Sequence, residues 1–340
     1  MTIHLPSRIT VGPSRPLALF SVILLACTFL VFGVPGYSQA KPSFVHMDYA
    51  TYNPVSLVLK DKGWLEQDMA RDGVKVDWVL SQGSNRALEF LNSNSVDFGS
   101  TAGAAALIAA SNGTPIYGVY LYSKPEWTAL VTLPGSGITS IQDLKGKRVA
   151  ATIGTDPYIF LLRALDTVGM TERDIQLVSL QHADGGAALV QKDVDAWSGL
   201  DPIMAKLQLE NHAVLFYRNA DFNTYGALNV RKEFADRYPS YVVRVLADYE
   251  RAKAYSRSHL AEVIDILARE GQIPRQVAAL QVNERTDLKV SVPGEAFRRS
   301  ITAAAVVLQK GGQIKTDVDV KKLVADYINP SFAETALAQK

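Results

Sequence analysis

The chain has 340 residues, of which 48% are hydrophobic, 20% charged and 9% aromatic. This is the composition of an ordinary globular protein, and it excludes disordered, collagen-like and polytopic membrane classes. The length favours two lobes or two domains. A formal net charge of +1 gives no support for nucleic acid as a partner. The single cysteine, Cys27, lies in an apolar N-terminal segment, so the rest of the chain offers no disulfide, thiol nucleophile or cysteine metal site.

The N-terminal segment is typical of a secretory signal peptide. Arg8 and Arg15 are its charged residues, positions 17–34 are almost continuously apolar, and Ser38-Gln39-Ala40 supplies small residues at −3 and −1. We therefore expect export to the periplasm and cleavage after Ala40.

Two other interpretations of this segment stay open. Leu24–Cys27 resembles a lipoprotein cleavage box, although a strongly apolar stretch after the cysteine is unusual for one. An uncleaved anchor, with an interaction or receptor role, is the second alternative, because about 18 apolar residues barely span a bilayer. Gly33, Pro35 and Gly36 at the end of the run favour processing instead.

From Ser43 onward, strand-like and helical patterns alternate. We expect strands over 43–49, 74–80, 95–99, 115–122, 127–133, 147–152, 175–180, 194–199, 213–217 and 224–230. The helices between them are expected over Pro54–Met69, Ser84–Asn92, Thr101–Ala110, Pro157–Val168, Gly185–Gln191 and Pro202–Glu210. Such alternation predicts an α/β protein with parallel strands. Only helices are expected after residue 230, over Lys232–Arg237, Pro239–Arg257, Ala261–Glu270, Pro293–Gln309 and Val320–Ile328.

A weak internal repeat indicates two lobes of like construction. Both Val96-Asp97 and Val194-Asp195 follow a helical pattern and a polar turn, and each precedes apolar residues. The polar and aromatic stretches Tyr122–Trp127 and Asp221–Tyr225 are the predicted crossings between the lobes, where two segments would form a hinge. The predicted lobes are residues 41–126 with 227–340, and residues 127–226.

Nucleotide and metal motifs are incomplete. Gly135-Ser136-Gly137 lacks the third glycine of a dinucleotide fingerprint, and Gly146-Lys147 lacks the Ser or Thr of a P-loop. No two histidines or carboxylates have a spacing specific to metal ligands. We therefore expect no cofactor and no metal.

An exported α/β hydrolase is the enzymatic alternative. Gly99–Gly103 lies where a nucleophile elbow is expected, but its central residue is Thr101 rather than serine. A triad also needs a histidine, and none of the candidates has a recognisable setting. These candidates are His46, His182, His212 and His259. The favoured interpretation is that the small residues allow a ligand to approach the amides of a helix N-terminus.

Three X-Pro pairs predict a binding crevice. Asn53-Pro54, Asp156-Pro157 and Asp201-Pro202 each follow a strand pattern and are expected to begin a helix, with a capping side chain and proline at N1. Ligands of open α/β sheets bind beyond the carboxyl ends of the strands, so these starts, with Thr101, are predicted to line one crevice. Aromatic residues at the same edges suit a small organic ligand. They are Tyr49, Tyr52, Trp127, Tyr158, Trp197 and Tyr225.

An ordered set of motifs over residues 43–260 resembles the nitrate/sulfonate/taurine family of periplasmic solute-binding proteins, above all the aliphatic sulfonate binding proteins of ABC importers. The set is Ser81–Asn85, Val96–Thr101, Asp143–Ala150, Val194–Trp197 and Asp201-Pro202. The resemblance implies a two-lobed, type II-like clamshell with a mixed sheet flanked by helices in each lobe and the C-terminal helices on lobe one. It also implies a monomeric binding protein, not an enzyme, that captures a small sulfonate or related anion and delivers it to an ABC permease.

The same resemblance implies the residues that bind the ligand. They are Tyr52, Asn53, Gln82, Gly83, Ser100, Thr101, Gly154, Thr155, Asp156, Trp197 and Asp201. The segment Gly154-Thr155-Asp156-Pro157 departs from the Gly-Ser-Ser type turn of many relatives. Either Asp156 caps its own helix and the ligand is a simple sulfonate, or it meets an ammonium and the ligand is a zwitterion such as taurine. An aromatic or pyrimidine ligand is a further alternative.

Overall fold

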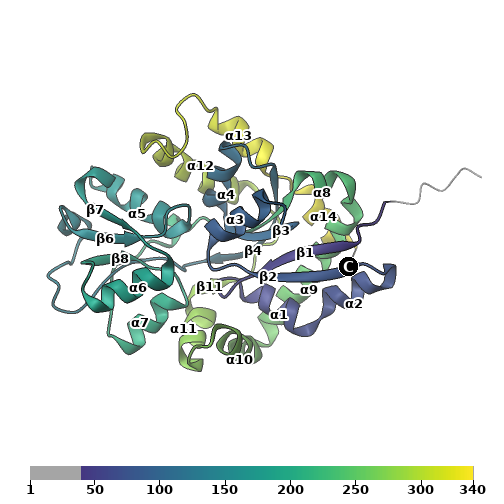
Figure 1. The fold of residues 1–340 in the computed structure, drawn as a ribbon, viewed down its shortest axis with the longest axis horizontal. Coiled ribbons are helices and arrows are strands. Elements are labelled where there is room, and N and C mark those ends of the chain that lie inside the picture. Colours follow the sequence, from purple (N-terminus) through teal and green to yellow (C-terminus); the bar gives the residue numbers. More distant parts are fainter. Residues whose placement is uncertain (1–39, 340) are drawn as a thin grey trace, which may run out of the picture. The chain divides into compact units, whose positions relative to one another are not determined.

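A computed structural model describes residues 40–339, which contain two mixed β-sheets flanked by helices (Figure 1). The predicted signal peptide and Cys27 lie outside the described residues. The first sheet has the strand order β11-β4-β10-β3-β1-β2, and the second has the order β7-β6-β8-β5-β9. We call each sheet with the helices that pack on it the first lobe and the second lobe.

Both sheets contain parallel and antiparallel pairs. In the first sheet β1 is parallel to β2 and β3, whereas β10 is antiparallel to β3 and β4. In the second sheet β6 is parallel to β7 and β8, whereas β5 is antiparallel to β8 and β9. The mixed sheets are therefore confirmed, and the parallel strands that the alternating pattern predicted occur in both of them. The strands are β1 Phe44–Tyr49, β2 Lys75–Leu80, β3 Phe98–Ala102, β4 Ile116–Pro125, β5 Leu130–Thr132, β6 Arg148–Ala151, β7 Gln176–Ser179, β8 Ala196–Ser198, β9 Val214–Tyr217, β10 Gly226–Arg231 and β11 Thr286–Asp287.

Helices cover the sheets, and the C-terminal ones pack on the first lobe. The long helix α9 and the last two helices contact β4. The helices of the second lobe are α5 Asp156–Thr167, α6 His182–Gln191 and α7 Ile203–Glu210. The others are α1 Pro54–Lys62, α2 Trp64–Met69, α3 Ser84–Asn92, α4 Gly103–Ser111, α8 Lys232–Arg237, α9 Pro239–Ser258, α10 Leu260–Gly271, α11 Arg275–Arg285, α12 Glu295–Lys310, α13 Val320–Tyr327 and α14 Ser331–Ala338. Short 3-10 turns occur at Ala70–Asp72, Ile141–Leu144, Glu172–Asp174 and Ala220–Phe222.

Several predicted elements have different bounds in the structure. The helix expected over Pro54–Met69 is divided at Gly63, whose φ of 60° gives the left-handed C-cap that ends α1. The short strand β11 contradicts the expectation of helices only after residue 230. The segment Gly99–Gly103 is not a strand-to-helix turn, because β3 continues to Ala102 and α4 begins at Gly103.

The chain passes between the two sheets twice. It leaves the first sheet after β4 to enter β5, and it returns from β9 to β10. The predicted crossing Asp221–Tyr225 lies within the second passage, whereas only the last two residues of Tyr122–Trp127 lie in the first, because β4 continues to Pro125. The lobe boundaries at residues 126/127 and 226/227 stay a prediction.

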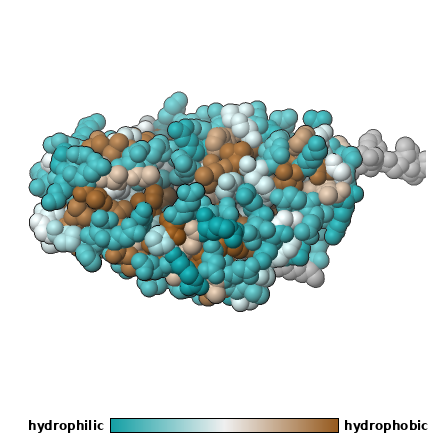
Figure 2. Space-filling view, turned by 60° about the horizontal axis from the view of Figure 1, so that its bottom comes forward, coloured by the Kyte–Doolittle hydropathy of each residue, from teal (hydrophilic) through white to brown (hydrophobic). Residues whose placement is uncertain are grey.

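Buried apolar side chains fill both lobes. The largest cluster includes Phe98, Tyr120 and Phe160, and a smaller cluster surrounds Trp197 in the second lobe. Figure 2 shows a face on which hydrophilic residues predominate and apolar residues appear in patches between them. Within residues 40–339, no helix combines the length and the apolar character that crossing a membrane requires.

Candidate functional site

A small cavity lies between the two lobes. Its lining residues are Tyr52 and Ser84 from the first lobe, Thr155, Asp156, Pro157, His182 and Leu200 from the second, and Trp127 from the passage between the sheets. The cavity volume is about 10 Å³. This is about the volume that one water molecule occupies. An organic ligand therefore fits only when the lobes move apart.

Three helices begin at this cavity. Ser84 is the first residue of α3, Asp156 of α5 and His182 of α6. These helices follow the carboxyl ends of β2, β6 and β7, which is where ligands bind in open α/β sheets. The first amides of a helix have no carbonyl partner within the helix and attract anions. The cavity therefore combines anion-binding features of both lobes.

The contacts of Asp156 match neither of the two roles that the sequence predicted for it. Thr155 is the N-cap of α5, so Asp156 is the first residue of the helix and not its cap. Its carboxylate instead accepts hydrogen bonds from Trp127 Nε1 (2.9 Å), Thr224 N (2.9 Å) and Thr224 Oγ1 (2.6 Å). Burial raises the pKa of this carboxyl, while these hydrogen bonds counteract the rise. Asp156 therefore ties α5 to the two passages between the lobes, and the prediction that it caps its helix is wrong.

The aromatic wall of the cavity consists of Tyr52 and Trp127. Their rings meet edge to face, with centroids 5.9 Å apart. The Tyr52 hydroxyl donates to the Ser100 carbonyl (2.9 Å), and the Trp127 indole donates to Asp156, so both rings are held by hydrogen bonds. Fixed aromatic faces of this kind suit the apolar part of a small ligand.

A buried polar network lies on the first-lobe side, next to the lining residue Tyr52. Asn53 Nδ2 donates to Ser100 Oγ (2.9 Å), and Ser100 Oγ donates to Asp48 Oδ1 (2.8 Å). Burial raises the pKa of Asp48 to about 6. The Thr101 hydroxyl donates to the Ala102 carbonyl and accepts from Asn229 Nδ2. The side chains of Asn53, Ser100 and Thr101 are therefore engaged within the first lobe, and their role as ligand contacts stays a prediction.

The start of α4 is occupied by protein groups. Gly103 N donates to the carbonyl of Thr224, and Ala104 N donates to Thr224 Oγ1. The interpretation that a ligand binds these amides next to Thr101 is therefore wrong in this arrangement. Asn53 and Pro54 do begin α1 as predicted, with the Asn53 side chain accepting from Ser56 N.

Glycines allow the lobes to approach each other. A Cβ atom on Gly83 would lie 2.8 Å from Asn85 Oδ1 and 2.9 Å from His182 Nε2. Gly154 has a φ of 81°, and a Cβ there would lie 3.6 Å from Asn85 Cβ of the first lobe. Gln82 is exposed beside Gly83. The predicted residues Gly83, Gly154 and Thr155 therefore meet at the contact between the lobes.

Trp197 and Asp201 lie away from the cavity lining. Trp197 is buried in the second-lobe core, where a Cβ on Gly185 would lie 2.7 Å from its Nε1 atom. Asp201 Oδ1 accepts from Arg285 Nη1 of α11 (2.8 Å) and from Ala205 N. Burial raises the pKa of Asp201 to about 6. The expectation that Asp201 caps a helix with Pro202 at N1 is wrong, because α7 begins at Ile203 and Pro202 is its N-cap. Asp201 instead forms an ion pair between the lobes.

His182, like Ser84, is a lining residue that the sequence reasoning did not select as a ligand contact. Its side chain is buried, and its Nδ1 atom lies 3.1 Å from Thr152 Oγ1. Burial lowers its pKa to about 3, so the imidazole is neutral at physiological pH. The sequence signal was available, because His182 lies two residues after the end of the strand predicted over 175–180. The predicted helix began at Gly185, and His182 was therefore left outside it.

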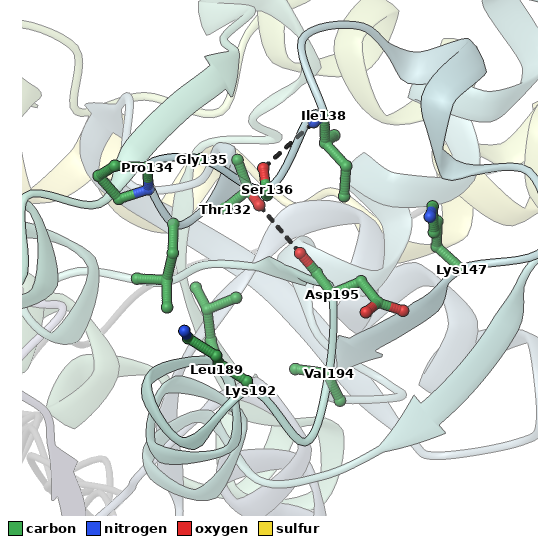
Figure 3. A pocket seen from close by; sticks show the side chains of 11 residues that line it. Thr132, Pro134, Gly135, Ser136, Ile138, Lys147, Leu189, Lys192, Val194 and Asp195 are labelled. Atoms are coloured by element: carbon green, nitrogen blue, oxygen red, sulfur yellow. Dashed lines mark hydrogen bonds between the residues drawn. The ribbon is translucent and has the colours of Figure 1, made fainter.

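A larger pocket lies on the second lobe alone (Figure 3). Its volume is about 210 Å³, and its lining includes Thr132, Lys147, Lys192 and Asp195. The Asp195 carboxylate is bonded to Arg148, and the Thr132 hydroxyl to the Asp195 carbonyl. Because no first-lobe residue is among its lining, closing the lobes would not enclose a ligand there. Within residues 40–339, no group of three or more His, Cys, Asp and Glu side chains is arranged to hold a metal ion.

Known proteins resemble this chain in sequence and in structure. A family model described as NMT1/THI5 like matches residues 55–262. A protein of Escherichia coli that carries the name of an aliphatic sulfonates-binding protein is 31% identical over 250 residues, which cover 73% of this chain and 78% of the relative. A Bacillus subtilis protein with the same name is 25% identical over 326 residues, which cover 94% of this chain and 96% of the relative.

The MOPS-bound alkanesulfonate-binding protein SsuA of Xanthomonas axonopodis pv. citri has the same fold, with a TM-score of 0.78 and 25% identity. The match covers 85% of this chain and 99% of that structure. The two-lobed periplasmic binding protein fold predicted from the sequence is therefore confirmed. With a family model that matches residues 55–262 and relatives named for sulfonate binding that align over most of its length, the chain belongs to the NMT1/THI5-like family.

Proposed function

We propose that this protein binds a small organic sulfonate, or a related anion, in the cavity between its lobes and delivers it to an ABC permease. The observation that carries this proposal is the meeting of the starts of α3, α5 and α6 at one cavity beside the wall of Tyr52 and Trp127. The names of the relatives support the same ligand class.

The chemistry of the cavity suits a permanently charged anion. A sulfonate has no proton to release at neutral pH, so fixed N–H and O–H donors are its best partners. Each charge-assisted hydrogen bond contributes about 1.5–3 kcal/mol. Two or three such bonds from amides in the first turns of the helices would therefore suffice for measurable binding. The apolar tail of the ligand would face Tyr52, Trp127 and Leu200.

Delivery to a permease requires a form that differs between loaded and empty protein. The ligand would enter an open form, and the lobes would then close onto it and bring donors from both sides into contact with it, so the loaded protein would differ in shape from the empty one. The protein would act as a monomer outside the cytoplasm, after cleavage of the signal peptide at Ala40. Intact-mass analysis of envelope protein should find Lys41 first, and a chain that starts at a lipidated Cys27 would contradict this part of the proposal.

Calorimetry on residues 41–340 tests the ligand class. Propane-1-sulfonate, taurine and an uncharged alcohol of equal length are titrated, and the sulfonates should bind while the alcohol does not. A ligand at 100 times its Kd adds about 2.7 kcal/mol to stability, so thermal unfolding gives a second readout. Failure of every small sulfonate and related anion to bind would overturn the proposal.

A matched pair of variants locates the site. Leu200→Trp should abolish binding, because the new ring fills the cavity, whereas Leu209→Trp on the exposed side of α7 should leave binding unchanged. Unaltered affinity in a folded L200W protein would place the ligand elsewhere. NMR spectra of the ligand after long incubation test the enzymatic alternative, since a binding protein leaves the ligand chemically unchanged.

A further inference from the structure

The imidazole of His182 lines the cavity and carries a hydrogen-bond acceptor at the contact between the lobes. The single hydroxyl proton of Thr152 is donated to the Leu180 carbonyl (2.8 Å), so Thr152 Oγ1 can only accept from His182. This assigns the imidazole proton to Nδ1 and leaves a lone pair on Nε2. Only 2% of the surface of His182 is exposed, so the residue has little access to water.

This acceptor has no partner among the described residues. His182 Nε2 is buried without a hydrogen bond, and so is Asn85 Oδ1 on the opposite lobe. Both atoms are directed at Gly83, since a Cβ on that residue would lie within 2.9 Å of each. The Asn85 amide is oriented by its own donation to Gln181 Oε1 (3.3 Å). An unpaired buried acceptor is costly, so the unpaired Nε2 atom of His182 indicates that its donor is a group absent from the described residues.

A plain alkanesulfonate does not supply that donor. Sulfonate oxygens only accept hydrogen bonds, and a lone pair on Nε2 repels them. Protonation of His182 would change this, but burial lowers its pKa to about 3. The Asp156 carboxylate does not intervene either, because its oxygens accept from Trp127 and Thr224. The amides at the helix starts and the Nε2 acceptor therefore require two different ends of one ligand.

We propose that His182 determines the ligand specificity of the cleft by accepting a hydrogen bond at Nε2 from an N–H or O–H group of the ligand. The ligand class is then a short sulfonate, or related anion, that carries a hydroxyl or amino group. This inference rests on the proposed function and narrows it. Thr152 is a positioning residue, since it fixes the tautomer that exposes the acceptor.

Three ligands of nearly equal shape test the proposal on the unaltered protein. Isethionate carries a hydroxyl, taurine an ammonium and propane-1-sulfonate a methyl group at the same position. Leaving a buried acceptor unpaired costs about 1–3 kcal/mol, so the Kd of propane-1-sulfonate should exceed that of isethionate by about 5- to 150-fold. Equal Kd values for the three ligands would overturn this inference and leave sulfonate binding intact. Binding of none of them would overturn the proposed function together with the inference.

A variant then assigns the selectivity to one side chain. His182→Phe keeps a planar ring without an acceptor, and the ratio of the two Kd values should fall to within about twofold of one. His259→Phe is the matched control, because His259 is exposed and stacks on Tyr255. It should retain the full ratio. An unchanged ratio in folded His182→Phe would refute the role of His182.

Nitrogen-15 NMR of the histidine side chains needs no variant. The proposal predicts a protonated Nδ1 and a bare Nε2 at pH 7, and a change of the Nε2 shift on binding isethionate but not propane-1-sulfonate. Observation of the opposite tautomer, with the proton on Nε2, would overturn the inference even if His182→Phe fails to fold.

Discussion

The two lobes repeat one sheet but place their polar side chains differently. The order β4-β10-β3-β1-β2 in the first lobe corresponds to β9-β5-β8-β6-β7 in the second. Asp97 accepts from His46 N (2.9 Å) in the first lobe, and Asp195 accepts from Arg148 N (2.8 Å) in the second. The repeat seen in the sequence around Val96 and Val194 is thus confirmed as a repeated local structure.

The positions that correspond through this repeat carry different chemistry. Asp48 and Ser100 form a buried pair in the first lobe, where the second lobe has Ala150 and Ser198. At the cavity, Ser84 begins α3 while His182 begins α6. Ser84 Oγ accepts from Ala102 N inside its own lobe, whereas His182 Nε2 is unpaired within residues 40–339. A repeated scaffold therefore separates two tasks, since buried polar bonds fix the first lobe and the second presents the unpaired acceptor.

The largest expected difference in unfolding free energy is between variants of the two repeated aspartates. Asp97 is also paired with Arg231 (2.7 Å), and both side chains are at most 15% exposed. Removing one partner of a buried pair costs about 3–5 kcal/mol, so Asp97→Ala should lower the unfolding free energy by that amount. Asp195→Ala should cost only about 1 kcal/mol, because Arg148 and Asp195 are 44% and 33% exposed. Urea unfolding measures both, and equal losses would contradict the difference between the lobes.

The pH dependence of stability sharpens the comparison at Asp48. Its folded pKa of about 6 lies above its usual 3.8, so the folded state binds more protons between these values and stability falls as pH rises through this window. About two pKa units correspond to about 3 kcal/mol at most. Asp48→Asn removes this group, so the stability of the variant relative to the original protein should rise from pH 4 to pH 7. A constant difference over that range would show that Asp48 does not titrate there.

The smallest expected difference in stability is between variants of Ser100 and Ser198, which correspond through the repeat. Ser100→Ala loses a hydrogen bond to Asp48 and one from Asn53, and it should cost about 2–3 kcal/mol. Ser198→Ala loses one bond to the Pro157 carbonyl (2.6 Å), and it should cost about 1 kcal/mol. Parallel denaturation of the two variants measures the difference of about 1–2 kcal/mol. A larger loss for Ser198→Ala would reverse our ranking of the two lobes.

Local patterns predicted many elements well, because their determinants lie within a few residues. The bounds of α3 and α8 agree with those expected from the sequence. Helix α11 was missed because its buried face combines Gln281 and Arg285 with Val277 and Val282, so it has no simple apolar period.

The site was less predictable, since its contacts join distant segments. Thr224 lies 68 positions after Asp156, and no spacing rule places its hydroxyl at that carboxylate. The general rule that ligands bind beyond the carboxyl ends of strands located the cavity. Among the residues that follow strands of the second lobe, it led to the choice of Asp201, whereas His182 is the one that lines the cavity. Arg285 explains this difference, because it engages Asp201 from a helix that the sequence did not indicate.

The ion pair between Arg285 and Asp201 also bears on how tightly any ligand is held. Both side chains are at most 2% exposed, and the pair joins the two lobes directly. Since the closed cavity admits about one water, a ligand enters only molecules in which such contacts are broken. The measured affinity is then the intrinsic affinity multiplied by the fraction of open molecules, so an open population of about 1% weakens binding about 100-fold. Under the proposed function, a residue outside the cavity lining would thereby influence the ligand concentration at which the protein loads.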